Sequence, residues 1–334
     1  MNRTLLVLLV GACLIPVCAD AELLLVLNKF DHQAALVDPK TYQVLAKLRT
    51  GRGPHEAAVM PDGRYAFVAN YGAVRVFRGV AQQSFEAGHS LTVLDLERRR
   101  VHRTWELGEC RQPHGIAVSR DGRRVWVTCE GAKAVLELDA TNGKVLQTWT
   151  TGQNLSHMLV PTPDEAKLYV ANAGSGSVTV IERASGRVTS LPTGAGAEGI
   201  DVSPDGRRVW VTNGGANTVS VIDVATDSVV ADLESGGQFP IRAKFTPEGS
   251  QVWVSNAESN NVVVFDAKTT ERIGTVEVGA VPVGIQMSPD GARAFVANTN
   301  GDKVTVIDVA KRVVLRTFTT GNEPDGMAWA TTKR

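Results

Sequence analysis

The chain of 334 residues has little cysteine and no excess of charge of either sign. Its 35 lysine and arginine residues balance 35 aspartate and glutamate residues, so the formal net charge is zero. This balance argues against nucleic acid as a partner, because polyanion-binding proteins need a basic surface, and it gives no support for a polybasic membrane anchor. With four cysteines, a chain of this length relies on a large apolar core rather than on a disulfide scaffold.

Several catalytic and cofactor motifs are also missing from the sequence. There is no Cys-x-x-Cys-His segment, so covalent c-type haem is not supported. A Gly-x-Ser-x-Gly elbow, a phosphate-binding P-loop and a His-Glu-x-x-His zinc motif are absent too, since His55-Glu56 lacks the second histidine. These absences leave metal binding and catalysis to residues that the fold must bring together from separate segments.

Long apolar runs are confined to the first residues of the chain. Met1–Ala21 combines Arg3, the apolar segment Leu5–Val10 and small residues around Ala19, a pattern typical of a secretory signal peptide. The alternatives are an uncleaved anchor and lipid attachment at Cys13. We expect an exported protein, periplasmic or secreted, with no stable membrane insertion.

Removal of a signal peptide leaves two cysteines, Cys110 and Cys129. In an oxidising compartment two thiols form a disulfide by default, and this is the preferred prediction. The alternatives are metal ligation together with His114, or unpaired thiols.

A repeated turn dominates the rest of the chain. Pro-Asp-Gly or a close variant recurs, and after a first interval of 59 residues its acidic positions are 43, 41, 43 and 42 residues apart. A period near 42 residues is typical of a propeller blade with four short strands. The turns occur at 61–63, 120–122, 163–165, 204–206, 247–249 and 289–291.

Each repeat has the same internal order. An apolar strand precedes the turn, an alternating strand such as Arg208–Thr212 follows it, and a third strand ends at an acidic residue ten positions after an asparagine such as Asn213. In one repeat Asn70 and Asp95 are 25 residues apart, which places an insertion at 71–88. This insertion is predicted to be a lid, with a tolerated surface loop as the alternative.

The two chain ends complete each other. The tail resembles the first strand of a repeat and the head resembles the last three, so together they form one more blade beside six whole repeats. We therefore predict an all-β fold over residues 22–334, a single seven-bladed β-propeller of four-stranded antiparallel blades. Its last blade is closed by the N- and C-terminal strands, which protects the sheet edges.

The strand sequences resemble the YVTN family of β-propeller proteins. The resemblance rests on Tyr-Val-Ala-Asn at 169–172, Trp-Val-Thr-Asn at 210–213, Trp-Val-Ser-Asn at 253–256 and Phe-Val-Ala-Asn at 295–298, together with the turns. It covers nearly the whole chain after the signal peptide. It implies a propeller related to lactonase-like and cytochrome d1-like proteins, and it leaves the activity open because this fold serves many functions.

Candidate site residues emerge when the repeats are aligned just before each inner strand. Two adjacent positions then hold three of the six histidines together with three acidic residues and an arginine. These residues are His55, Glu56, His114, His157, Glu198, Arg242 and Asp325. In this alignment His157 falls one residue away from His55 and His114. Ring closure is expected to bring all of them to the mouth of one channel.

The predicted chemistry follows from the residue types. His55, His114, His157 and Glu198 can hold Zn²⁺ or a similar divalent ion. Glu198 or Glu56 is a candidate general base, and Arg242 can bind an anionic group of the substrate. Asp325 and His89 are expected ligand-binding residues. The alternative is a polar funnel filled by water.

Other repeated residues are predicted to be structural. The asparagine ending each second strand tolerates left-handed backbone and bonds its own turn. Trp126, Trp210 and Trp253 alternate with valines and should pack between blades.

The leading functional hypothesis is a propeller that binds a small molecule or a divalent metal in its funnel, in the manner of a lactonase-like hydrolase or lyase. The alternative is a non-catalytic scaffold that binds an envelope protein. The sequence does not decide whether the protein is an enzyme.

Overall fold

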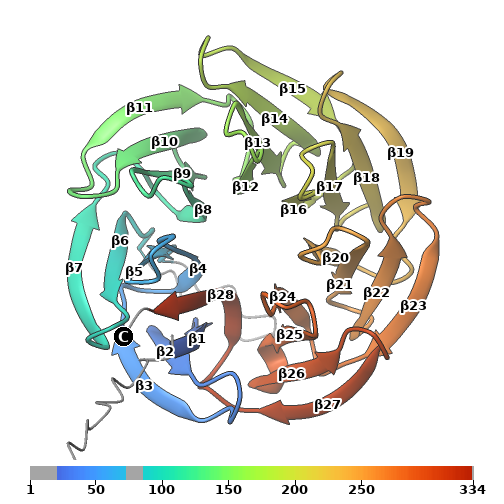
Figure 1. The fold of residues 1–334 in the computed structure, drawn as a ribbon. Helices are drawn as coiled ribbons and strands as arrows, with labels where there is room; N and C mark the ends of the chain where they lie inside the picture. The colour runs from blue at the N-terminus through green and yellow to red at the C-terminus, as the bar shows by residue number, and fades with distance from the viewer. Residues whose placement is uncertain (1–20, 73–85, 333–334) are drawn as a thin grey trace, which may run out of the picture.

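The structure is a computed structural model that describes residues 21–72 and 86–332. Within these ranges, seven four-stranded antiparallel sheets are arranged in a ring around a central axis (Figure 1). The predicted all-β, seven-bladed propeller is confirmed. The predicted signal peptide and most of the predicted lid, at 1–20 and 73–85, lie outside the described residues.

The six blades with consecutive strands run from the innermost strand outwards. The first three blades comprise β4 (Pro54–Val59), β5 (Tyr65–Asn70), β6 (Ser90–Asp95) and β7 (Arg100–Glu106); β8 (Pro113–Val118), β9 (Arg124–Cys129), β10 (Ala134–Asp139) and β11 (Val145–Thr150); and β12 (Ser156–Pro161), β13 (Lys167–Asn172), β14 (Ser177–Glu182) and β15 (Val188–Pro192). The next three comprise β16 (Ala197–Val202), β17 (Arg208–Asn213), β18 (Thr218–Asp223) and β19 (Ser228–Glu234); β20 (Pro240–Phe245), β21 (Gln251–Asn256), β22 (Asn261–Asp266) and β23 (Arg272–Glu277); and β24 (Pro282–Met287), β25 (Arg293–Asn298), β26 (Lys303–Asp308) and β27 (Val313–Phe318). A short 3₁₀ helix, η1 (Thr299–Gly301), follows β25.

The remaining blade is built from both ends of the chain. Its order is β28 (Pro324–Thr332), β1 (Ala21–Asn28), β2 (Gln33–Val37) and β3 (Val44–Arg49). β28 pairs with β1 antiparallel, for example Leu24 with Trp329, so the C-terminal strand becomes the innermost strand beside the N-terminal one (Figure 1). This pairing closes the ring as predicted and gives every inner strand a neighbour on both sides.

The core lies between neighbouring blades. Trp126, Trp210 and Trp253 are fully buried there, as predicted. The Pro-Asp-Gly turns also behave as expected, because Gly63 and Gly206 have φ of +72° and +74°, which an L side chain rarely adopts. Among the described residues, no helix is long and apolar enough to cross a bilayer.

The repeated asparagines have a structural role, but not through the predicted left-handed backbone conformation. None of them has positive φ among the described residues. Their buried side chains instead bond the neighbouring strand and loop. Asn70, for example, accepts from the backbone N–H of Gly51 at 3.0 Å and donates to Thr92 Oγ1 at 3.0 Å. The left-handed assignment was therefore wrong, and the asparagine ties strands together within its blade.

Every inner strand begins with the same irregularity. Pairing with the second strand slips by one residue directly after the first residue of the inner strand, which is a β-bulge. The preceding residue has positive φ in each case, between +52° and +73°. These residues are Gly53, Gln112, Leu155, Gly196, Phe239, Val281 and Glu323. The bulge redirects the second residue of each inner strand, and seven such residues therefore lie around one end of the channel.

Candidate functional site

The second residues of the inner strands form an asymmetric ring. In order around the axis they are His55, His114, His157, Glu198, Ile241, Val283 and Asp325. Five consecutive blades thus contribute polar side chains and the remaining two contribute apolar ones. The one-residue offset predicted for His157 is wrong, because Ser156 pairs with Asn172 as Pro113 pairs with Cys129. His157 therefore occupies the same position as His55 and His114.

The three imidazoles lie in contact. The ring centroids of His114 and His157 are 3.6 Å apart, and those of His55 and His114 are 4.2 Å apart. Tyr71 stacks on His55 at 5.1 Å and meets His114 edge-on at 5.6 Å. Residues from β4, β8 and β12 are therefore brought together, as the propeller closure predicts.

His157 is held between two carboxylates. Its Nδ1 lies 2.5 Å from Glu130 Oε1, and its Nε2 lies 3.3 Å from Glu198 Oε1. Tyr71 donates its hydroxyl proton to Glu130 Oε2 at 2.7 Å. Burial alone would lower the pKa of His157, but the hydrogen bonds and negative charges of Glu130 and Glu198 outweigh burial and raise it to about 9.

His55 lies on the other side of the cluster, beside a buried ion pair. Lys29 Nζ donates to Asp325 Oδ2 at 2.8 Å, and His55 Nδ1 lies 3.3 Å from the same oxygen. Burial lowers the pKa of His55 to about 3 despite the nearby Asp325 charge. Burial opposes ionisation of Asp325, yet Lys29 and His55 hold its pKa at about 2. At neutral pH the His55 imidazole is therefore neutral and the Asp325 carboxyl group is ionised.

Glu56 and Arg242 form an ion pair across the channel, from β4 to β20. Burial raises the pKa of Glu56, and the Arg242 charge opposes that rise. On the side away from the histidines, the channel contains a cavity of about 340 Å³ lined by all seven inner strands, with Glu56 and Arg242 in its wall. None of the second-position residues lines this cavity, so the ion pair separates it from the histidine cluster.

His114 is the least satisfied residue of the cluster. It is 1% exposed, and neither of its ring nitrogens has a hydrogen-bond partner among the described residues. Burial lowers its pKa well below the usual value, so the ring is neutral. A buried polar group without a partner costs about 1–3 kcal/mol, so its presence calls for an explanation.

A ligand set surrounds this unsatisfied imidazole. His114, Glu130 and His157 each offer one ligand atom, and these atoms lie within 4.8 Å of one another. Two imidazoles and a carboxylate are ligand types of zinc and related divalent ions. Two of the four predicted ligands, His55 and Glu198, lie outside this set; Glu130 belongs to it, and Glu198 approaches Nε2 of His157.

The charge balance of the funnel favours a cation. The carboxylates are Glu56, Glu130, Glu198 and Asp325, and the permanent cations are Lys29 and Arg242. Because His157 is also protonated in the metal-free protein, the net charge is one negative; a metal ion that displaces this proton meets two negative charges in a largely buried site. A divalent cation would neutralise them, which matters because an uncompensated buried charge is costly.

Sequence reasoning missed Lys29, Tyr71 and Glu130. All three occupy one repeat position, directly after the last residue of the second strand, namely Asn28, Asn70 or Cys129. The other four blades have Ala173, Gly214, Ala257 and Thr299 at this position. An alignment of the repeats at this position would therefore have singled out the three polar residues, but not their contacts with the inner strands.

Two other predicted site elements lie outside the histidine cluster. His89 is 45% exposed at its side chain, and its Nδ1 lies 2.7 Å from Glu106 Oε2 rather than in the histidine cluster. Cys110 and Cys129 are joined by a disulfide with an S–S distance of 1.98 Å. The disulfide belongs to the same blade as His114.

Comparison with known families agrees with this architecture. The family model described as "Lactonase, 7-bladed beta-propeller" matches residues 28–277. The chain belongs to this lactonase family of seven-bladed β-propellers. No curated protein matches the chain.

Solved structures with a similar fold include two propellers that match over most of their length. Hydrazine synthase of Kuenenia stuttgartiensis is 22% identical, with a TM-score of 0.74 and coverage of 86% of this chain and 92% of that one. A functionally unknown protein of Desulfotomaculum acetoxidans is 12% identical, with a TM-score of 0.77 and coverage of 93% and 99%. These similarities extend the propeller assignment beyond residue 277.

A third structure, dihydro-heme d1 dehydrogenase NirN in complex with DHE, is 18% identical with a TM-score of 0.65. The match covers 89% of this chain and 63% of that chain. At these identities the likeness shows the fold of this lactonase-family member and does not transfer an activity.

Proposed function

We propose that this lactonase-family propeller binds a divalent transition metal in its funnel through His114, His157 and Glu130, and that a small molecule binds beside the metal. The observation that carries the proposal is His114, a fully buried imidazole without a partner on either nitrogen among the described residues. A metal ion would take one nitrogen as a ligand, and the ligand atoms of His157 and Glu130 already lie within 4.8 Å.

Such a centre supports hydrolase or lyase chemistry. A bound Zn²⁺ polarises a carbonyl group or lowers the pKa of a bound water. Glu198, adjacent to His157, and His55, whose Nδ1 lies 3.3 Å from Asp325 Oδ2, are the candidate general bases of this chain. Both residues lie on the polar side of the ring. The reaction would therefore take place on that side.

The opposite side of the ring constrains the ligand. Ile241 and Val283 are the second residues of their inner strands, a position at which the other five blades have polar side chains. Ala257, the residue directly after β21, is also apolar and buried. A ligand that fills the funnel would place a metal-binding oxygen towards His114 and an apolar flank towards Ile241 and Val283. The small-molecule substrate class is thus an oxygen-bearing, partly apolar compound.

We also propose that the protein acts after export, in the periplasm or outside the cell. The expected signal peptide supports this proposal, and so does the disulfide between Cys110 and Cys129, because such bonds persist in oxidising compartments.

Calorimetric titration of Zn²⁺ into untagged, metal-free protein tests the metal site. We expect one equivalent to bind to the wild type, and His114→Ala to abolish that binding. The matched control is His102→Ala, which removes a histidine on β7 whose ring lies 5.1 Å from Tyr65 and outside the cluster. Unchanged zinc binding in His114→Ala, or equal loss in His102→Ala, would refute the proposed site.

Catalysis is tested separately with a panel of lactones, esters and related carbonyl compounds. Turnover should require added metal and should be lost in Glu198→Gln or His55→Gln while zinc still binds. Metal binding without any metal-dependent turnover would leave the protein a metal-binding propeller and would overturn the hydrolase or lyase assignment.

A further inference from the structure

At one pair of positions, the blade that carries His114 departs from the pattern of five other blades, and the blade of β12 has Gln153 and Asn172 there. In six blades, the residue three before the inner strand faces the residue that ends the second strand. Five blades use glycine and asparagine for this pair, and an added Cβ on each glycine would approach the asparagine side chain to 2.6–2.8 Å. These pairs are Gly51–Asn70, Gly194–Asn213, Gly237–Asn256, Gly279–Asn298 and Gly321–Asn28.

The blade of β8 to β11 replaces both partners. Cys110 occupies the glycine position and Cys129 the asparagine position, with their Cα atoms 5.2 Å apart and their sulfur atoms bonded. A close non-covalent contact has thus become a covalent bond in one blade. Two coordinated replacements at facing positions indicate that this blade needs a firmer connection than the others.

The connection is not needed for the propeller fold itself. In every blade the residue after the second strand donates its backbone N–H to the residue that precedes the inner strand, for example Glu130 to Gln112 at 3.2 Å and Ala257 to Phe239 at 2.9 Å. The corresponding donors in the remaining blades are Lys29, Tyr71, Ala173, Gly214 and Thr299. The loop before each inner strand is therefore already tied to the second strand.

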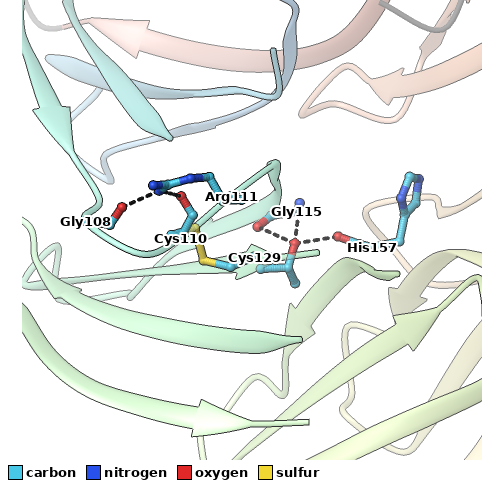
Figure 2. Close-up of a disulfide and its surroundings, with 7 residues drawn as sticks. Gly108, Cys110, Arg111, Gly115, Cys129 and His157 are labelled. Atoms are coloured by element: carbon cyan, nitrogen blue, oxygen red, sulfur yellow. Dashed lines mark hydrogen bonds between the residues drawn. A yellow bond between two sulfur atoms is a disulfide. The ribbon is translucent and has the colours of Figure 1, made fainter. Parts of the chain in front are cut away.

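The blade of β8 to β11 differs from the others in the contacts made at the end of β9. Thr128, directly before Cys129, donates its hydroxyl proton to the backbone oxygen of His157 at 2.6 Å and accepts from the N–H of Gly115 at 2.8 Å (Figure 2). Glu130, directly after Cys129, bonds the ring of His157 and the hydroxyl of Tyr71. The half-cystine thus lies between two residues that hold the metal-binding cluster.

The other half-cystine restrains the second ligand-bearing strand. Cys110 lies three residues before Pro113, where β8 begins, and His114 is the next residue. Figure 2 shows the disulfide beside the hydrogen bonds of Gly115 and of the backbone oxygen of His157, both of which are made to Thr128 Oγ1. Through one bond, the strand end with Glu130 and the loop that leads to His114 are fixed relative to each other.

We propose that the Cys110–Cys129 disulfide is a positioning element for the metal site, which holds Glu130 and His114 at ligand spacing. This inference rests on the proposed metal-binding function. Metal sites require their ligands within about 0.5 Å of the productive arrangement, and outer residues that orient the ligands change metal affinity by about 10–100-fold. Since His114 has no hydrogen bond at either nitrogen among the described residues, its position depends on the backbone that carries it.

The test restores the pair that the other blades use. Cys110→Gly/Cys129→Asn should fold with the circular dichroism spectrum of the wild type, because five blades are built with this pair. Its dissociation constant for Zn²⁺, measured by calorimetry, should rise by about 10–100-fold. If this variant does not fold, Cys110→Ser/Cys129→Ser provides the same measurement.

The matched control is Asn298→Ala, which breaks the equivalent contact with Gly279 in the blade of β24, where no proposed metal ligand lies. This variant should lower the melting temperature yet bind Zn²⁺ within about twofold of the wild type. A merely stabilising role of the disulfide would give both variants the same effect on zinc affinity.

The outcomes separate the two proposals. Zinc binding by the wild type with unchanged affinity in the glycine–asparagine variant would overturn the positioning role and leave the metal site intact. Equal weakening in Asn298→Ala would also overturn it. No zinc binding by the wild type would overturn both proposals.

Discussion

Raising the pH of the metal-free protein should destabilise it through one buried side chain, His157. The folded protein holds the proton of this imidazole with a pKa of about 9, because of Glu130 and Glu198, whereas the unfolded chain releases it near 6.5. A raised pKa in the folded state stabilises the fold in full below pH 6.5. That stabilisation is lost as the pH rises through 9.

The size of the expected loss in unfolding free energy follows from the difference between the two pKa values. At about 1.4 kcal/mol per pH unit, the gap between 6.5 and about 9 corresponds to about 3 kcal/mol of unfolding free energy. Urea unfolding of metal-free protein between about pH 6.5 and pH 9.5, compared with His157→Gln, isolates this contribution because the other titrating groups remain in both proteins. The wild type should lose about 3 kcal/mol relative to the variant over this range. If the unfolding free energies of the wild type and the variant changed in parallel with pH, the assignment of a protonated His157 held between Glu130 and Glu198 would be refuted.

Three further variants test the electrostatics of the funnel. His114→Leu should abolish zinc binding. Because it removes an unsatisfied polar group, it should leave the urea-unfolding free energy of the metal-free protein unchanged or raise it by about 1 kcal/mol. A decrease of more than about 2 kcal/mol would contradict this interpretation. Asp325→Asn leaves Lys29 buried without its counter-charge and should cost about 3–5 kcal/mol in the same assay, whereas wild-type stability would contradict the importance of this pair. Glu56→Leu/Arg242→Leu should be less destabilising than either single change, and additive losses in this double-mutant cycle would show that the two residues do not interact.

The fold was predictable because the repeat is regular. The spacing of the turns and the ten-residue interval between asparagine and the acidic residue follow from four short strands of nearly constant length. Circular closure followed from the incomplete head and tail, and the pairing of Leu24 with Trp329 confirms it. None of these features depends on where an individual side chain points.

The site was predictable in part. Alignment at the inner strands found His55 and His114, since both occupy the bulged second position. His157 was misplaced by one residue because the sequence alignment equates Val160 with Val118, whereas Pro161, paired with Leu168, holds that place in β12.

Glu130 was missed for a different reason. It follows Cys129, which replaces the repeated asparagine, and the residue type at this position varies among the blades, from alanine to lysine and tyrosine. Only the ring geometry shows that the residue after the second strand of one blade reaches the inner strand of the next, where Glu130 meets His157.

The most direct test of the metal site is a crystal structure of zinc-loaded protein with anomalous scattering measured at the zinc absorption edge. The account predicts one strong peak in the funnel within about 2.3 Å of nitrogen atoms of His114 and His157 and an oxygen of Glu130. A funnel without an anomalous peak, or a peak bound by other residues, would contradict it.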